Sequence, residues 1–228
     1  LQARRTPAAT IFPPKVPTLY VAEKELNLKK QPKSYVLPNT TMDVEVTIDY
    51  IKGQTYNIMG MVEGADATLK GEYVIVAAHY DHLGMGGQGS LFQGESAIHY
   101  GADDNASGTA GVIELASRFK EEPARRSVIF MTFTGEERGI LGSKHWVSTP
   151  TVPLDKVKAM INMDMIGRLK DNKLNVHGTG TSTEWKAILD SAISGTEIPL
   201  AKNSEGFGPS DHTSFVPEGI PALHFLTG

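Results

Sequence analysis

Residues 77–108 read AAHYDHLGMGGQGSLFQGESAIHYGADDNASG, and this stretch decides the fold prediction. An almost wholly apolar run, residues 73–78, leads into it, as expected for a strand that is buried on both faces of a sheet. The run stops at His79, a glycine-rich loop follows, and Asn105 then opens a helical pattern as a good N-cap. This order predicts a strand, a loop and a helix, with polar side chains where the strand ends.

The same arrangement recurs further along the chain. Two apolar runs, residues 127–133 and 157–163, predict buried strands, and the acidic residues Glu136, Glu137 and Asp164 follow their ends. Helical patterns separate these strands, which predicts an α/β fold: a three-layer α-β-α sandwich around a mixed, mostly parallel central sheet. In such sheets ligands bind at the carboxyl ends of the strands, so we expect these side chains to share one functional edge.

The N-terminal part differs from the rest of the chain in amino-acid composition. Residues 1–41 are rich in proline and basic residues, and we interpret them as a linker, as the remnant of another module or as a surface wrap. Within them, residues 16–30 predict a short strand followed by a helical turn. Alternating apolar residues at 44–48 predict a strand that forms a hairpin with residues 55–62. We therefore place the main domain at 42–228.

Bulk composition restricts the function classes. The chain has 228 residues, 40% of them hydrophobic, which is enough for a sizeable core. A net charge of −4 gives no electrostatic case for binding nucleic acid or an anionic membrane, and the apolar runs are too short to span a bilayer. Without cysteine, any metal site must use histidine and carboxylates. The sequence has no nucleophile elbow and no phosphate-binding P-loop motif, so a serine hydrolase and a nucleotide hydrolase are disfavoured.

Four side chains at the expected edge are ligands of the kind that zinc accepts: His79, Asp103, Glu137 and Asp164. Taken singly, each residue also has a purely structural interpretation. These are, in the same order, a surface histidine, a helix cap, an acid in the first turn of a helix and a buried acid paired with another residue. Four such features at one edge favour a metal site over coincidence. Asp103, between loop and helix, is the natural bridge of a metal pair.

Two neighbouring carboxylates complete the chemistry. Glu136 must point away from its neighbour Glu137, and a free carboxylate beside an activated water is a competent general base. Asp81 can accept the second ring N–H of His79 and so fix the tautomer of that imidazole.

Five strings resemble motifs of the di-zinc aminopeptidase family, in the family's order: HYDHLG, GADDNASG, FTGEERGILGS, NMDMIG and GPSDHTSF. Relatives of that family include glutamate carboxypeptidase-like enzymes, glutaminyl cyclases and the non-catalytic transferrin receptor. The resemblance covers residues 42–228. It implies a secreted or periplasmic metallo-aminopeptidase that removes N-terminal residues from peptides with a free N-terminus. It also implies two Zn²⁺ ions, with Co²⁺ or Mn²⁺ as possible substitutes, and a water that bridges them.

The resemblance also implies residue roles. The implied ligands are His79 and Asp164 for one zinc, Glu137 for the other and Asp103 for both. Glu136 matches the general base, and Asp81 matches the partner of the metal-binding histidine. The peptide bond between Asp103 and Asp104 is expected to be cis, and Asp104 is expected to lie beside the ligands or on the substrate side without binding metal. His212 matches a motif that lines the substrate side.

One departure from the family pattern concerns the last metal ligand. In the family this histidine follows the strand that matches GIPALHFLTG, whereas the present sequence ends at Gly228. We therefore expect that the C-terminal part of the domain is missing, that one zinc site lacks a protein ligand, and that this piece can be inactive alone. Residues 16–30 resemble the end of a protease-associated domain, which many such peptidases carry as an insert.

Three alternatives stay open on the same scaffold. A carboxypeptidase should offer an arginine cluster, and only Arg138 and Arg168 lie near the motifs. A glutaminyl cyclase uses one zinc, and no positive sign of it is present. A receptor-like binding domain should have lost ligands by substitution, whereas the ligand types here are intact, which favours an enzyme.

Overall fold

The computed structural model describes residues 19–32, 41, 43, 45–47, 52–87, 89–92 and 94–228. The chain divides into two units, Leu1–Lys52 and Gly53–Gly228. In the first unit helix α2 spans Leu19–Lys29, so the predicted strand is wrong for the described part of residues 16–30, which is helical up to Lys29. The unit boundary lies after the predicted domain start at residue 42, and the assignment of residues 1–41 to a linker or insert remnant stays a prediction.

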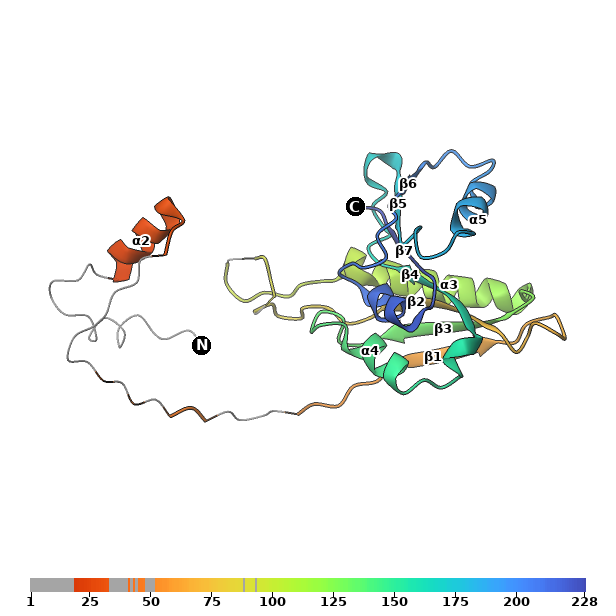
Figure 1. Ribbon diagram of the computed structural model, residues 1–228, viewed down its shortest axis with the longest axis horizontal. Helices are drawn as coiled ribbons and strands as arrows, with labels where there is room; N and C mark the ends of the chain where they lie inside the picture. The colour runs from red at the N-terminus through yellow and green to blue at the C-terminus, as the bar shows by residue number, and fades with distance from the viewer. Residues whose placement is uncertain are drawn as a thin grey trace. The chain divides into compact units, whose positions relative to one another are not determined.

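The second unit is built on a seven-stranded sheet in the order β1-β3-β2-β4-β7-β5-β6 (Figure 1). Its strands are β1 (Ile58–Val62), β2 (Tyr73–His79), β3 (Ser127–Phe133), β4 (Val157–Met163), β5 (Leu174–His177), β6 (Leu200–Lys202) and β7 (Ala222–Leu226). Its α-helices are α3 (Gly108–Glu121), α4 (Leu141–Ser148) and α5 (Trp185–Ala192). β1 runs antiparallel to β3 and β5 antiparallel to β7, and the other neighbours are parallel. The predicted mixed, mostly parallel sheet is confirmed.

The position of β2 determines where a site can form. β2 lies between β3 and β4 and is parallel to both. The chain reaches β3 through α3 and then crosses β2 to reach β4 through α4. Because the strands that follow β2 are added on opposite sides of it, its carboxyl end is a switch point, where α/β sheets bind their ligands. His79 is the last residue of β2 and pairs with Phe133 at the end of β3.

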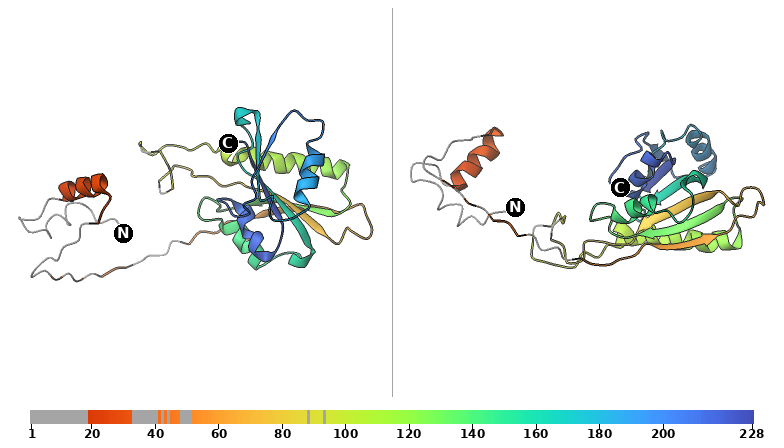
Figure 2. Two further views of the ribbon diagram at one scale, coloured as in Figure 1. Left: turned by 45° about the horizontal axis from the view of Figure 1, so that its top comes forward. Right: turned by 60° about the horizontal axis from the view of Figure 1, so that its bottom comes forward.

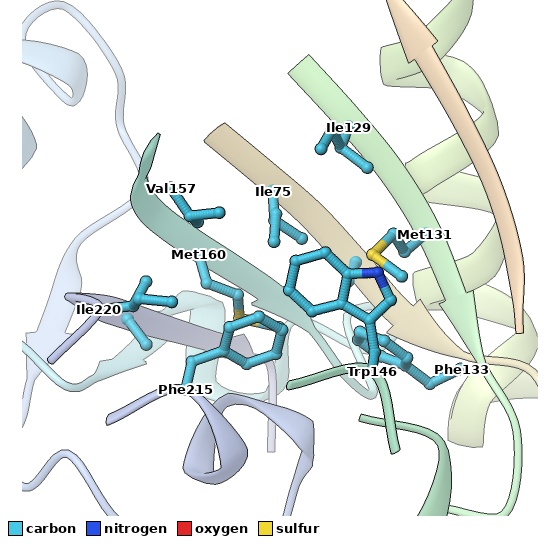
Figure 3. Close-up of a cluster of buried hydrophobic side chains, with 11 residues drawn as sticks. Ile75, Ile129, Met131, Phe133, Trp146, Val157, Met160, Phe215 and Ile220 are labelled. Carbon is cyan, nitrogen blue, oxygen red and sulfur yellow. The ribbon is translucent and has the colours of Figure 1, made fainter. Parts of the chain in front are cut away.

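Helices cover both faces of the sheet, which makes three layers (Figure 2). On one face Val112 of α3 packs with Val76 and Phe130. On the other face Trp146 of α4 packs against Phe215, with ring centroids 5.7 Å apart, over the strands (Figure 3). Each fully buried side chain of this size contributes roughly 1.5–3 kcal/mol, so both layers hold the strand ends in place.

The first strand pairs differently from the prediction. Residues 45–47 of the predicted strand at 44–48 have no regular structure, and its two ends lie outside the described residues. β1 pairs antiparallel with β3 at the edge of the sheet. Among the described residues, no helix has the length and apolar character needed to cross a membrane.

Candidate metal centre

A first group of ligand atoms forms where β2 and β4 end. The Nδ1–H of buried His79 donates to the carbonyl oxygen of Asp81 at 3.1 Å. Since a carbonyl can only accept, a neutral His79 ring carries its proton on Nδ1 and keeps a lone pair on Nε2. Nε2 lies 3.2 Å from Oδ1 of Asp104 and 3.4 Å from Oδ1 of Asp164. The ring is therefore held so that Nε2 faces two carboxylates, as in metal-binding histidines.

A second group shares one residue with the first. His82 Nδ1 lies 2.7 Å from Oε1 of Glu137 and 3.8 Å from Oδ2 of Asp104. Within each group all the candidate ligand atoms lie within 4.8 Å of one another. Asp104 thus presents one carboxylate oxygen to each group, which is the arrangement of a bridging ligand in a two-metal site.

Asp103 does not occupy the bridging position, and the structure corrects this prediction. Oδ1 of Asp103 accepts the backbone N–H of Gly167 at 2.7 Å, and its Oδ2 lies 2.9 Å from Nε of Arg168. Both oxygens of Asp103 thus face other parts of the protein. The cis peptide bond also lies one residue later than predicted, between Asp104 and Asn105. Asp104 has non-helical backbone angles, φ −104° and ψ 93°, and its side chain takes the position between the two groups.

Comparison with known proteins identifies the family of the chain. The sequence profile of peptidase family M28 matches residues 57–227. The chain belongs to peptidase family M28. Aminopeptidase YwaD of Bacillus subtilis is 27% identical over 161 residues, which are 69% of this chain and 32% of that protein. Leucine aminopeptidase 2 of Arthroderma otae is 26% identical over 198 residues, 82% of this chain and 37% of that protein.

Solved structures show the same relationship. The crystal structure of BSAP, a zinc aminopeptidase from Bacillus subtilis, matches with a TM-score of 0.61 at 30% identity, over 75% of this chain and 40% of that chain. An aminopeptidase from Aneurinibacillus matches with a TM-score of 0.59 at 26% identity, over 75% of this chain and 39% of that chain. The present M28 chain therefore spans about a third of the length of these curated relatives. The family resemblance inferred from the motifs is confirmed.

Glu136 offers a carboxylate that is not held by the protein. Its backbone N–H donates to Oδ1 of Asp81 at 3.0 Å. Among the described residues, no hydrogen bond or ion pair engages its side chain. Burial raises the pKa of Glu136 to about 8, and the nearby carboxylates of Asp211, Asp164 and Glu137 add to this rise while His79 opposes it. A free carboxyl group with a pKa near neutrality suits proton transfer.

The M28 site also attracts positive charge. Burial alone lowers the pKa of His79, but its contacts with Asp104, Asp164 and Asp81 outweigh burial and raise it. Burial likewise raises the pKa of Asp164, and the contact with His79 outweighs this and lowers it. Oδ2 of Asp164 accepts a hydrogen bond from Ser210 Oγ at 2.8 Å, which fixes the carboxylate. In the absence of a metal ion, an imidazolium at His79 thus balances carboxylates that a cation can balance instead.

His212 belongs to neither group of ligand atoms. It is fully buried and stacks on His224, with ring centroids 4.4 Å apart and planes inclined by 8°. Burial, with His224 and His177 nearby, lowers the pKa of His212 to about 3, so the ring is neutral at neutral pH. Its assignment to the substrate side stays a prediction.

Sequence reasoning missed His82. The motif HYDHLG contains it, three residues after His79, but it lies beyond the strand and no family role was carried over to it. One signal was available, because a second imidazole in the loop after the same strand is within reach of the same sheet edge.

Proposed function

We propose that this chain forms the metal-binding core of an exopeptidase that hydrolyses the N-terminal peptide bond of peptides. The observation that carries the proposal is the position of Asp104. Its two carboxylate oxygens face two separate groups of histidine and carboxylate ligands, and the free carboxylate of Glu136 lies at the same sheet edge. Membership of family M28 and the similarity to zinc aminopeptidases support the same activity.

The donor set fits zinc. Imidazole nitrogen and carboxylate oxygen are ordinary zinc ligands, and buried His82 Nδ1 and Glu137 Oε1 have no hydrogen-bond partner. His79, Asp104 and Asp164 would hold one ion, and Asp104 and Glu137 would contribute to a second. When bound, zinc supplies Lewis acidity toward the scissile carbonyl and the attacking water. Co²⁺ or Mn²⁺ could replace it, because these ligands suit several divalent metals.

Glu136 would act as the proton carrier. It takes a proton from the attacking water as the water oxygen bonds to the scissile carbonyl carbon. It then returns that proton to the leaving amine as the C–N bond breaks. The absence of a hydrogen bond or ion pair that restrains its carboxylate within the described residues supports this role.

Two further residues would hold the reacting groups in place. Asp81 accepts the backbone N–H of Glu136 through its carboxylate. It accepts the Nδ1–H of His79 through its backbone carbonyl, and not through the carboxylate as predicted, so it would orient the base and a ligand together. Ser210 donates to the far oxygen of Asp164 and leaves the near oxygen for the ion. Such support raises metal affinity by fixing the ligands before binding.

We infer an N-terminal amine as the substrate group, because the proteins that this chain resembles include zinc aminopeptidases. A carboxypeptidase should offer a cluster of arginines for the substrate carboxylate. Of the two arginines near the motifs, Arg168 lies 2.9 Å from Asp103 and is engaged there, which leaves Arg138 by itself. A single arginine favours aminopeptidase over carboxypeptidase activity.

A matched pair of substrates tests the proposal. The zinc-loaded chain should release 4-nitroaniline from a panel of aminoacyl-4-nitroanilides and leave the N-acetylated forms intact, and chelation with EDTA should stop the release. Hydrolysis of acetylated and free forms at equal rates would contradict the role of the free amine. Hydrolysis that survives complete removal of metal would contradict the metal-dependent mechanism.

A further inference from the structure

We propose that His82 is a protein ligand of the second metal ion and that it binds through Nδ1, together with Glu137 and Asp104. The inference rests on the proposed two-metal exopeptidase function. It assigns to this chain a ligand that neither the motif resemblance nor the comparisons assign. It also gives the second ion three protein donors, the number that catalytic zinc sites commonly use.

The first argument is how His82 and Glu137 meet. Nδ1 of His82 and Oε1 of Glu137 are 2.7 Å apart, yet the contact lacks the direction of a hydrogen bond and both atoms count as unsatisfied. Both atoms are also sealed from solvent. Buried polar atoms without partners are costly, and a cation bound by both lone pairs would satisfy them together.

The second argument is the symmetry about Asp104. Oδ1 of Asp104 faces Nε2 of His79 at 3.2 Å, and Oδ2 faces Nδ1 of His82 at 3.8 Å. Each half of the site therefore consists of one imidazole nitrogen, one oxygen of Asp104 and one further carboxylate, from Asp164 in one half and Glu137 in the other. The two halves offer the same types of ligand atom. The coordination that binds a cation in one half is therefore also available in the other half.

The third argument is that the fold makes room for this ring. Gly101 lies against His82, and a Cβ atom at Gly101 would come within 3.0 Å of Cβ and Cγ of His82. Gly101 also has φ 62°, a conformation that glycine adopts without strain. The imidazole of His82 can therefore lie directly over the loop backbone, beside the bridging carboxylate.

His99 provides a matched control. Its ring centroid lies 6.4 Å from that of His82, on the same loop. Unlike His82, it has partners for both nitrogens: Nδ1 contacts the carbonyl of Ala97 at 3.0 Å and Nε2 contacts Ser90 Oγ at 2.7 Å. Loss of His99 removes a neighbouring imidazole without removing a candidate ligand.

Zinc titration by calorimetry, with stoichiometry checked by elemental analysis, tests the inference. The unsubstituted chain and His99→Ala should bind two ions per chain. His82→Ala should keep one ion and bind the second more than about a hundredfold more weakly, since loss of an outer partner alone costs about 10–100-fold. His82→Ala with two ions at unchanged affinity would overturn the ligand role and leave the proposed function standing. No zinc binding by the folded unsubstituted chain would overturn both.

If His82→Ala does not fold, a spectroscopic measurement on the unsubstituted chain tests the same inference. In ¹⁵N-histidine-labelled chain, zinc should shift Nδ1 of His82 and Nε2 of His79, because these are the nitrogens that face Asp104. His82 should respond at Nδ1 and His79 at Nε2. A general change in the protein would not select a different nitrogen in each ring, so this pattern is specific to metal ligation. An Nδ1 resonance of His82 that does not respond to saturating zinc, while Nε2 of His79 responds, would refute the inference.

Discussion

Asp81 accepts the backbone N–H of Glu136 through Oδ1 at 3.0 Å, and the same oxygen lies 3.7 Å from Nδ1 of His79. One carboxylate therefore connects the end of β2, which carries a candidate metal ligand, with the loop after β3, which carries the candidate base. Burial raises the pKa of Asp81, but the contacts with His79 and the backbone N–H of Glu136 outweigh burial and lower it. The Asp81 carboxylate thus stays ionised, holds the backbone of Glu136 and lies beside His79.

Replacement of Asp81 should weaken metal binding and turnover together. Asp81→Ala removes the acceptor of the Glu136 N–H and the negative charge 3.7 Å from Nδ1 of His79. The backbone carbonyl that accepts the His79 Nδ1–H remains, so we expect zinc affinity to fall about 10-fold, the lower end of the range for such partners. Asp81→Asn keeps an oxygen that can accept the Glu136 N–H, and should lose less. Competition with a chromophoric chelator measures the affinities. If both variants bound zinc with the affinity of the unsubstituted chain, the Asp81 side chain would not orient the metal ligands.

The adjacent aspartates should behave differently. Asp104→Asn weakens a ligand shared by both groups, so we expect the chain to lose tight binding of both ions. Asp103→Asn changes the side-chain contacts to Gly167, Ser107 and Arg168, and should keep both ions. Elemental analysis after desalting distinguishes the two variants. Loss of metal in Asp103→Asn with retention in Asp104→Asn would restore the assignment made from sequence.

This pair shows where sequence reasoning stops. The two aspartates have the same chemistry and are adjacent in the sequence before the helix, so the motif alone does not separate them. The choice depends on the backbone at Asp104, which departs from helical angles before α3 begins. His82 was missed for a related reason: it lies in a loop without a period, and only the folded loop brings it to Glu137.

The fold itself was largely predictable. The mostly apolar runs at 127–133 and 157–163 are β3 and β4 to the residue, because strands buried between two helical layers are predominantly apolar. The alternating pattern at 44–48 indicates a strand with one solvent-exposed face, but it does not identify the strand that would pair with it. β1 instead pairs with β3 at the sheet edge, a non-local contact that leaves no local signal.

The free energy of unfolding should decrease as the pH decreases, because buried histidines are neutral in the folded chain. Burial lowers the pKa of His224 to about 4, and Asn162 donates to its Nδ1 at 3.1 Å, which requires that nitrogen to be unprotonated. The folded pKa lies below the unfolded value of about 6.5, so this contribution is present above pH ~6.5 and is lost as pH falls toward 4. Between pH 6.5 and 5 the loss should be about 2 kcal/mol.

Denaturant unfolding of the metal-free chain at several pH values checks this effect. His224→Gln should show a flatter pH dependence, whereas replacement of exposed His145 by Gln should leave the slope unchanged. The same slope in His224→Gln as in the unsubstituted chain would show that His224 is not the titrating group.

A glycine at the start of α3 should not tolerate a side chain. A Cβ atom at Gly108 would collide with the carbonyl oxygen of Met163 and with Oδ1 of Asn105. Although alanine favours helices by about 1 kcal/mol over glycine, this overlap should make Gly108→Ala less stable by about 1–3 kcal/mol. Gly71→Ala, where nothing lies within 4 Å of the added atom, is the matched control and should change stability by less than about 0.5 kcal/mol. Unfolding free energies that are equal in the two variants would contradict this packing.

In the proposed mechanism Glu136 moves the proton while other residues hold the metal. Zinc content and aminoacyl-4-nitroanilide hydrolysis, measured on the same sample of Glu136→Gln beside the unsubstituted chain, separate these two roles. Glutamine keeps the size of the side chain but cannot accept the proton, so we expect unchanged zinc content and a loss of turnover of at least about 100-fold. Loss of zinc from Glu136→Gln, or turnover that stays close to that of the unsubstituted chain, would contradict the role assigned to Glu136.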